Sequence, residues 1–203
     1  MDDVLIIGGG AAGMSCALVL GSAGEKAFAK DKKISIVLHQ KTSHLQTALF
    51  NNVLGLNPGT TGADILEKGK EQLQKLYPHV NIIEKHRVMS VEKKGGVFGV
   101  KTNKDSFTTK IIVVATGYTK AFNIKGLEQF VIPHKKSKPE KERVQLINTD
   151  HKVADGIYVA GTLAGWRSQF STACGSGAAV ATDILTLWNG GVHIKVHDKV
   201  NFQ

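Results

Sequence analysis

Apolar residues are concentrated along this chain in short, largely apolar runs, separated by longer stretches in which apolar and polar residues mix. The runs lie at residues 4–7, 34–38, 111–114 and 156–161. They are rich in valine and isoleucine, which is typical of strands buried on both faces of a parallel sheet. We therefore predict a parallel sheet whose strands come from all parts of the chain.

Three of the mixed stretches predict helices. Small and straight-chain residues fill 14–20, residues 65–76 carry apolar side chains at helical spacing, and a third helix is expected to begin near Thr172. Between 80 and 110 the pattern alternates instead, with turns at Gly95-Gly96 and Asn103. This predicts a small antiparallel meander. Its expected strands are 81–83, 88–93, 97–102 and 106–110.

Composition and charge narrow the class of protein. Apolar residues make up 42% of the chain and no run approaches the roughly 18 residues of a membrane helix. The acidic start leads directly into a strand rather than a secretory signal, so we expect no membrane association and a cytoplasmic location. The formal charge of +9 favours anionic ligands, but no aromatic residues interleave with the lysine runs, so nucleic-acid binding is not expected.

Only two cysteines are present, Cys16 and Cys174. They form no Cys-x-x-Cys pair and no metal-ligand spacing, so we expect no metal site. Both stand among small apolar residues, where a buried inert thiol is the usual finding. A reactive role for Cys174 stays open, because it falls in a segment that we place near a cofactor below.

A glycine-rich turn follows the first predicted strand and opens the first helix. Its pattern is Gly8-x-Gly10-x-x-Gly13. In this context Gly8 permits a tight turn, Gly10 lets backbone amides approach a pyrophosphate, and Gly13 allows close helix–strand packing. The helix N-terminus adds free N–H groups and a partial positive charge. The turn therefore predicts a dinucleotide phosphate site.

Strand, glycine turn, helix and strand make a βαβ unit, which predicts an α/β, Rossmann-like fold. We expect a parallel sheet with helices on one face, together with the small antiparallel β-meander. Residues 1–203 are expected to form a single domain. Residues 119–152 are polar, lysine-rich and interrupted by prolines, so we expect a connection with little fixed structure.

Four segments, in matching order and spacing, give the chain a family resemblance. They are Val4–Gly13, Val113-Val114-Ala115-Thr116-Gly117, Gly156–Gly161, and the glutamine-led Gln169–Gly177. The whole chain resembles the FAD domain of thioredoxin reductase-like and related pyridine nucleotide-disulfide oxidoreductases. The resemblance implies FAD binding by residues of all four segments and of the second strand's end. The implied cofactor residues are Gly8, Gly10, Ala11, Ala12, Gly13, His39, Gln40, Ala115, Thr116, Gly117, Gly161, Thr162, Gln169, Phe170 and Ser171.

The chain also departs from the family pattern. Family members insert a second Rossmann domain for NADPH, with its Cys-x-x-Cys, where this chain has only Tyr118 to Asp155. The resemblance therefore excludes thioredoxin reduction by the usual route. His39-Gln40 stands where an acid binds the adenosine ribose, and Thr162 replaces the usual aspartate. A neutral ligand makes weaker hydrogen bonds than a carboxylate, so we expect FAD to be held weakly.

These observations favour an FAD-dependent oxidoreductase, or the flavin-binding half of one, without a nameable catalytic residue. Its electron donor would be free NAD(P)H, another small molecule or a partner protein, and a homodimer stays open. A non-catalytic FAD- or NAD(P)-binding module that docks a redox partner is the alternative. A third interpretation is that the strand end at His39-Gln40-Lys41 binds an NADP 2′-phosphate.

Overall fold

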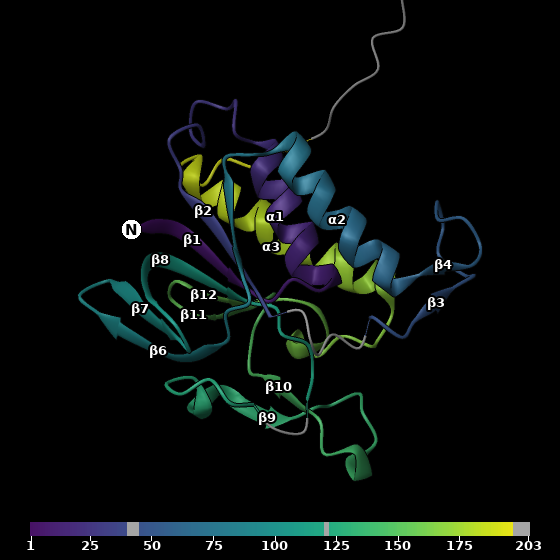
Figure 1. The fold of residues 1–203 in the computed structure, drawn as a ribbon. Coiled ribbons are helices and arrows are strands. Elements are labelled where there is room, and N and C mark those ends of the chain that lie inside the picture. Colours follow the sequence, from purple (N-terminus) through teal and green to yellow (C-terminus); the bar gives the residue numbers. More distant parts are fainter. Residues whose placement is uncertain (40–44, 120–121, 197–203) are drawn as a thin grey trace, which may run out of the picture.

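The computed structural model describes residues 1–39, 45–119 and 122–196, which fold into a sheet with three helices packed on it (Figure 1). The helices are α1 (Ala11–Ser22), α2 (Gly62–Leu76) and α3 (Phe170–Trp188). The strands are β1 (Asp2–Ile7), β2 (Ile34–Leu38), β3 (Leu49–Phe50), β4 (Thr60–Thr61), β5 (Val80–Glu84), β6 (Val88–Lys94), β7 (Val97–Thr102), β8 (Ser106–Val114), β9 (Val131–Pro133), β10 (Val144–Leu146), β11 (Lys152–Ala154) and β12 (Ile157–Val159).

The main sheet has the strand order β11-β12-β8-β1-β2-β5. β12, β8, β1, β2 and β5 are parallel, so their carboxyl ends meet at one edge of the sheet. β1 lies in the middle, where Ile6 pairs with Ile36 of β2 and with Val113 of β8. The chain runs outward from β1 in one direction through β2 and in the other through β8. This reversal of strand order is where α/β sheets place their ligands.

All three helices cover the same face of the sheet, as Figure 1 shows. Ile6, Ile36 and Val113 project to this face and join one buried cluster with Leu20 of α1 and Ile184 of α3. Each fully buried aliphatic side chain of this kind contributes roughly 1.5–3 kcal/mol. The expected α/β class, with helices on one face of a parallel sheet, is confirmed.

The opposite face is covered by the β6–β7 hairpin and by the segment between β8 and β11. Phe98 of β7 packs there beside Leu127 and Leu146, all of them almost fully buried, against Leu5 and Ile112 of the sheet. The segment also pairs β9 with β10 in an antiparallel two-stranded sheet. Our expectation of little fixed structure over 119–152 was therefore wrong, because a few buried apolar residues anchor this segment.

The meander is smaller than its pattern suggested. β5, expected as its first strand, pairs in parallel with β2 and is the edge strand of the main sheet. The expected strands 106–110 and 111–114 are one strand, β8. Its first half pairs with β7 and its second half lies between β1 and β12. The true meander is β6, β7 and the start of β8.

The helix boundaries differ from the expected ones by a few residues. α2 begins at Gly62, where Thr61 and Asp64 form a capping box by exchanging side-chain and backbone hydrogen bonds. α3 begins at Phe170, two residues before the expected Thr172. Among the described helices, none is long and apolar enough to cross a membrane.

Candidate functional site

The glycine turn between β1 and α1 passes directly against the end of β8. Gly8 has φ +114°, and a Cβ there would lie 2.5 Å from the carbonyl oxygen of Ala115. A Cβ on Gly13 would overlap the carbonyl group of Gly8. Larger residues would therefore push the turn off β8 or α1 off the turn. The structure gives Gly8 and Gly13 the conformational roles that the sequence pattern predicts.

Two helices begin at the carboxyl edge of the sheet with open N-termini. α1 follows Gly10 and α3 follows Gln169, and neither has a side-chain cap or an acidic residue in its first turn. The first N–H groups of a helix have no partner within the helix, and the aligned peptide dipoles add roughly half a positive charge. Both helix starts can therefore receive negatively charged groups.

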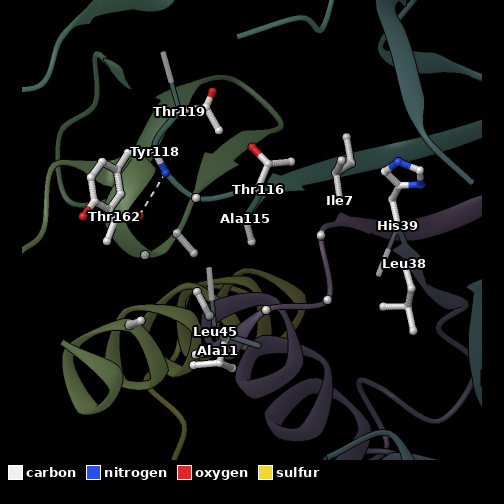
Figure 2. Close-up of a pocket in the computed structure, with 18 of the residues that line it drawn as sticks. Ile7, Ala11, Leu38, His39, Leu45, Ala115, Thr116, Tyr118, Thr119 and Thr162 are labelled. Atoms are coloured by element: carbon white, nitrogen blue, oxygen red, sulfur yellow. Dashed lines mark hydrogen bonds between the residues drawn. The ribbon is translucent and has the colours of Figure 1, made fainter. Parts of the chain in front are cut away.

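A cavity of about 500 Å³ joins the two helix starts and extends along the ends of the parallel strands. Figure 2 shows part of its wall, with Thr116 and Ala115 between Thr162 on one side and His39 on the other. The candidate cofactor residues that line it are Gly8, Gly10, Ala11, Ala12, His39, Ala115, Thr116, Gly117, Gly161, Thr162, Gln169 and Phe170. Gly13 and Ser171 lie outside the lining, and Gln40 falls outside the described residues.

The lining is free of acidic side chains wherever the structure describes it. His39, at the end of β2, shares its part of the wall with His86 and Arg87, which follow β5. The backbone N–H of His86 donates to the carbonyl of Leu38 at 3.2 Å, which ties this segment to the end of β2. His86 Nε2 lies 2.8 Å from Asp105 Oδ2, whereas Arg87 is exposed. The electrostatics of the cavity therefore favour an anion.

Sequence analysis did not select His86 and Arg87. Their position could have been found from the strand that precedes them, since residues after a parallel strand lie at the ligand edge. Assigning β5 to the meander removed it from that edge. The same error hid their proximity to His39.

Thr162 holds the backbone at the opposite side of the cavity. Its hydroxyl oxygen accepts a hydrogen bond from the backbone N–H of Tyr118 at 3.0 Å (Figure 2). Its carbonyl oxygen lies 3.0 Å from Nε2 of the buried His134, whose N–H donates to it. The hydroxyl thus links the segments that follow β8 and β12.

A hydrogen-bonded network lies behind Gly161. The backbone N–H of Gly161 donates to Ser176 Oγ at 2.8 Å, and Ser176 Oγ lies 2.9 Å from His151 Nε2. The indole N–H of Trp166 donates to the same nitrogen at 3.0 Å. Burial lowers the pKa of His151, against the opposing effect of Asp183 and Asp150. A neutral His151 with an unprotonated Nε2 satisfies both donors.

The cysteines do not add a reactive group to this arrangement. Both are free thiols, Cys16 fully buried in α1 and Cys174 half-buried in α3. Burial raises the pKa of both thiols and so disfavours the thiolate that nucleophilic cysteines need. Neither residue lines the cavity.

The residues present fit a dinucleotide with a pyrophosphate. A Cβ at Gly8 or Gly9 would meet Ala115 or Leu38, so the turn leaves only its backbone to face the cavity. Open helix N-termini and an acid-free lining suit phosphate groups, and about 500 Å³ lies within the usual roughly 300–1,000 Å³ of ligand sites. The ribose-binding acid of Rossmann sites is replaced by His39.

Two reductases are among the solved structures that share this fold. The chain superposes on a thioredoxin reductase from Gloeobacter violaceus with a TM-score of 0.73, at 16% identity, with 98% of each chain covered. A ferredoxin-flavin thioredoxin reductase from Clostridium acetobutylicum gives a TM-score of 0.65 at 18% identity, covering 92% of this chain and 98% of that one. At these identities the likeness shows the fold alone.

Comparison of sequences identifies the family as well as the fold. The chain is 30% identical over 123 residues to a ferredoxin--NADP reductase from Streptococcus agalactiae, an alignment that covers 57% of this chain and 34% of that protein. The chain thus matches about a third of the length of this relative. The sequence profile of the family described as pyridine nucleotide-disulphide oxidoreductase matches residues 2–164. Since that match includes the glycine turn, the end of β8 and Thr162, the chain belongs to the pyridine nucleotide-disulphide oxidoreductase family.

Proposed function

We propose that this chain binds FAD and forms the flavin-binding part of an oxidoreductase. The observation that carries the proposal is the single cavity that connects the N-termini of α1 and α3 and has no acidic side chain among its described lining residues. An FAD molecule has negative charge at its pyrophosphate and, when reduced, at its ring. Two separate positive helix ends in one cavity match that distribution.

Each part of the cavity has its own task in this proposal. The backbone of Gly8, Gly10 and Ala11 binds the pyrophosphate, and His39 and Arg87 contact the adenosine end. Thr162 donates its hydroxyl hydrogen to the ribityl chain. The start of α3, at Gln169 and Phe170, stabilises negative charge that develops on the ring. Bound FAD supplies the hydride and electron chemistry, while the protein binds, orients and tunes it.

The source of electrons lies outside this chain's own dinucleotide site. Between β8 and β12, the described residues form the β9–β10 pair, the short strand β11 and 3₁₀ turns rather than a second βαβ unit. NAD(P)H from solution or a reduced protein partner would therefore deliver electrons to the cavity.

A non-catalytic dinucleotide-binding module is the second candidate. It is favoured by His39 in place of the ribose-binding acid and by the thiols, which lie outside the cavity with raised pKa values. Such a module would hold the dinucleotide as a ligand or as a docking element for a redox partner.

Anaerobic absorption spectroscopy separates the two. We expect protein incubated with FAD and desalted to show visible flavin bands, which bleach when NADH or NADPH is added. Bound flavin that no nicotinamide or protein donor reduces would favour the non-catalytic module. Protein that shows no bound flavin even with excess FAD present would contradict the FAD proposal itself.

A further inference from the structure

A second pocket, of about 210 Å³, lies beside the cavity and is strongly basic. Its lining includes Lys136, Lys138, Lys141, Arg143 and Arg167 and, among the described residues, no acid. None of these five side chains forms an ion pair with another described residue. So many like charges around one small concavity repel each other unless an anion is shared between them.

Two aromatic rings hold part of this charge in place. Lys136 Nζ lies 4.8 Å from the ring centre of Trp166, and Arg143 Cζ lies 3.8 Å from that of Tyr118. Cation–π contacts of this kind orient a cation without neutralising it. The two rings and their cations therefore form a preformed wall for a negatively charged ligand.

The position of the pocket connects it to the site described above. Tyr118 and Ser168 line both the basic pocket and the cavity. Ser168 directly precedes Gln169, the residue from which α3 begins. The remaining wall comes from the β9–β10 region, which links β8 to β12. The pocket thus adjoins the part of the cavity at the start of α3.

We propose that the basic pocket binds the phosphate groups of a nicotinamide dinucleotide, whose nicotinamide end then reaches the cavity past Tyr118 and Ser168. This inference rests on the proposed flavin function and adds to it a place for the electron donor. Lysine and arginine clusters recognise phosphate through charge-assisted hydrogen bonds. Two electrons and a proton would leave the dihydronicotinamide as a hydride, so that NAD(P)H is oxidised to NAD(P)⁺ and FAD is reduced.

The shape of the pocket favours a small phosphorylated molecule over an acidic protein. Protein partners dock on broad and nearly flat surfaces, whereas small ligands occupy concave sites. Here five cations and two aromatic rings line one concave site, and Arg143 is half-buried.

Trp166 provides the test, because it lies in the pocket wall and the chain has only one other tryptophan, Trp188. In Trp188→Phe protein, the fluorescence of Trp166 is followed during titration with inorganic pyrophosphate, NADH and NADPH at fixed pH. We expect a saturable change with each ligand, weakened by added salt. The double variant Lys138→Gln/Lys141→Gln, which leaves both ring contacts in place, should raise the dissociation constants about tenfold. Lys101→Gln on β7, outside the pocket, should leave them unchanged.

Several results would overturn the proposal. Trp166 could fail to respond to pyrophosphate and both dinucleotides, or the double variant could bind like its parent. Reduction of the flavin by an acidic redox protein but not by NADH or NADPH, lost in the double variant, would assign the surface to a protein. Flavin retention is read separately by absorbance, so a yellow protein without a Trp166 response contradicts this proposal alone. A Trp166 response in protein that never holds flavin contradicts the proposed function alone.

Discussion

Two glycines of α3, only two residues apart, are expected to respond to alanine in opposite directions. Gly177 faces α1, and a Cβ there would lie 2.8 Å from the carbonyl carbon of Ala12 and closer still to its oxygen. Because a backbone carbonyl cannot rotate away as a side chain can, the two helices must separate. Gly175 is exposed, and a Cβ there would have nothing within 4 Å.

The magnitudes follow from these contacts. Overpacking against rigid neighbours costs about 3 kcal/mol at the upper end of its usual range. Alanine recovers about 1 kcal/mol of helix propensity over glycine. Gly177→Ala should therefore lose about 2 kcal/mol of folding stability, and Gly175→Ala should gain up to about 1 kcal/mol. In a domain of this size, each kcal/mol shifts Tm by roughly 2–4 °C.

Thermal unfolding followed by circular dichroism at 222 nm measures both variants under identical conditions. We expect Tm to fall by about 4–8 °C in Gly177→Ala and to rise by about 2–4 °C in Gly175→Ala. Equal shifts in the same direction would refute the close packing of α1 on α3. That packing holds the start of α1 at the cavity.

Three further predictions concern the network and the cavity. Since burial lowers the pKa of His151, the stability that the neutral ring contributes is present above the ordinary value of 6.5 and is lost as pH falls below it. The free energy of unfolding in urea should therefore be lower at pH 5.5 than at pH 7.5. His151→Gln should reduce this difference, and His193→Gln, at an exposed position, should not. Gly10→Glu places a carboxylate at the start of α1 and should abolish FAD binding while circular dichroism stays unchanged; unaltered flavin content would argue against this turn as the phosphate site. His39→Glu and Thr162→Asp should each tighten FAD binding by about twofold to thirtyfold in fluorescence titrations, because a carboxylate makes stronger hydrogen bonds than a neutral group. Weaker binding in both variants would mean that the present side chains are adapted ligands.

The parallel core of the fold was readable from sequence because its signals are local. The run at 4–7 is apolar at every position and the run at 34–38 at every position but Ser35, and only strands covered on both faces need that. The glycine turn between them carries its own conformational signature. From these features, sequence analysis selected candidate cofactor residues, most of which the structure places in one cavity.

The errors came from contacts between residues far apart in the chain. β5 mixes apolar and polar residues because it is an edge strand, and such a mixture does not reveal whether the neighbouring strand is parallel. In 119–152 the strands are only three residues long, so the burial of Leu127 and Leu146 leaves no periodic pattern. The basic pocket was missed for the same reason, because Lys136 and Arg167 meet only after this segment folds back.

The central claim is that the cavity between the starts of α1 and α3 binds FAD. Its most direct test is an equilibrium titration of the purified protein with FAD, followed by flavin fluorescence, with Gly10→Glu protein measured in parallel. The account predicts saturable binding of one FAD per chain that weakens as salt rises and is absent in the variant. A parent protein that never saturates, or a variant that binds FAD as tightly as the parent, would contradict it.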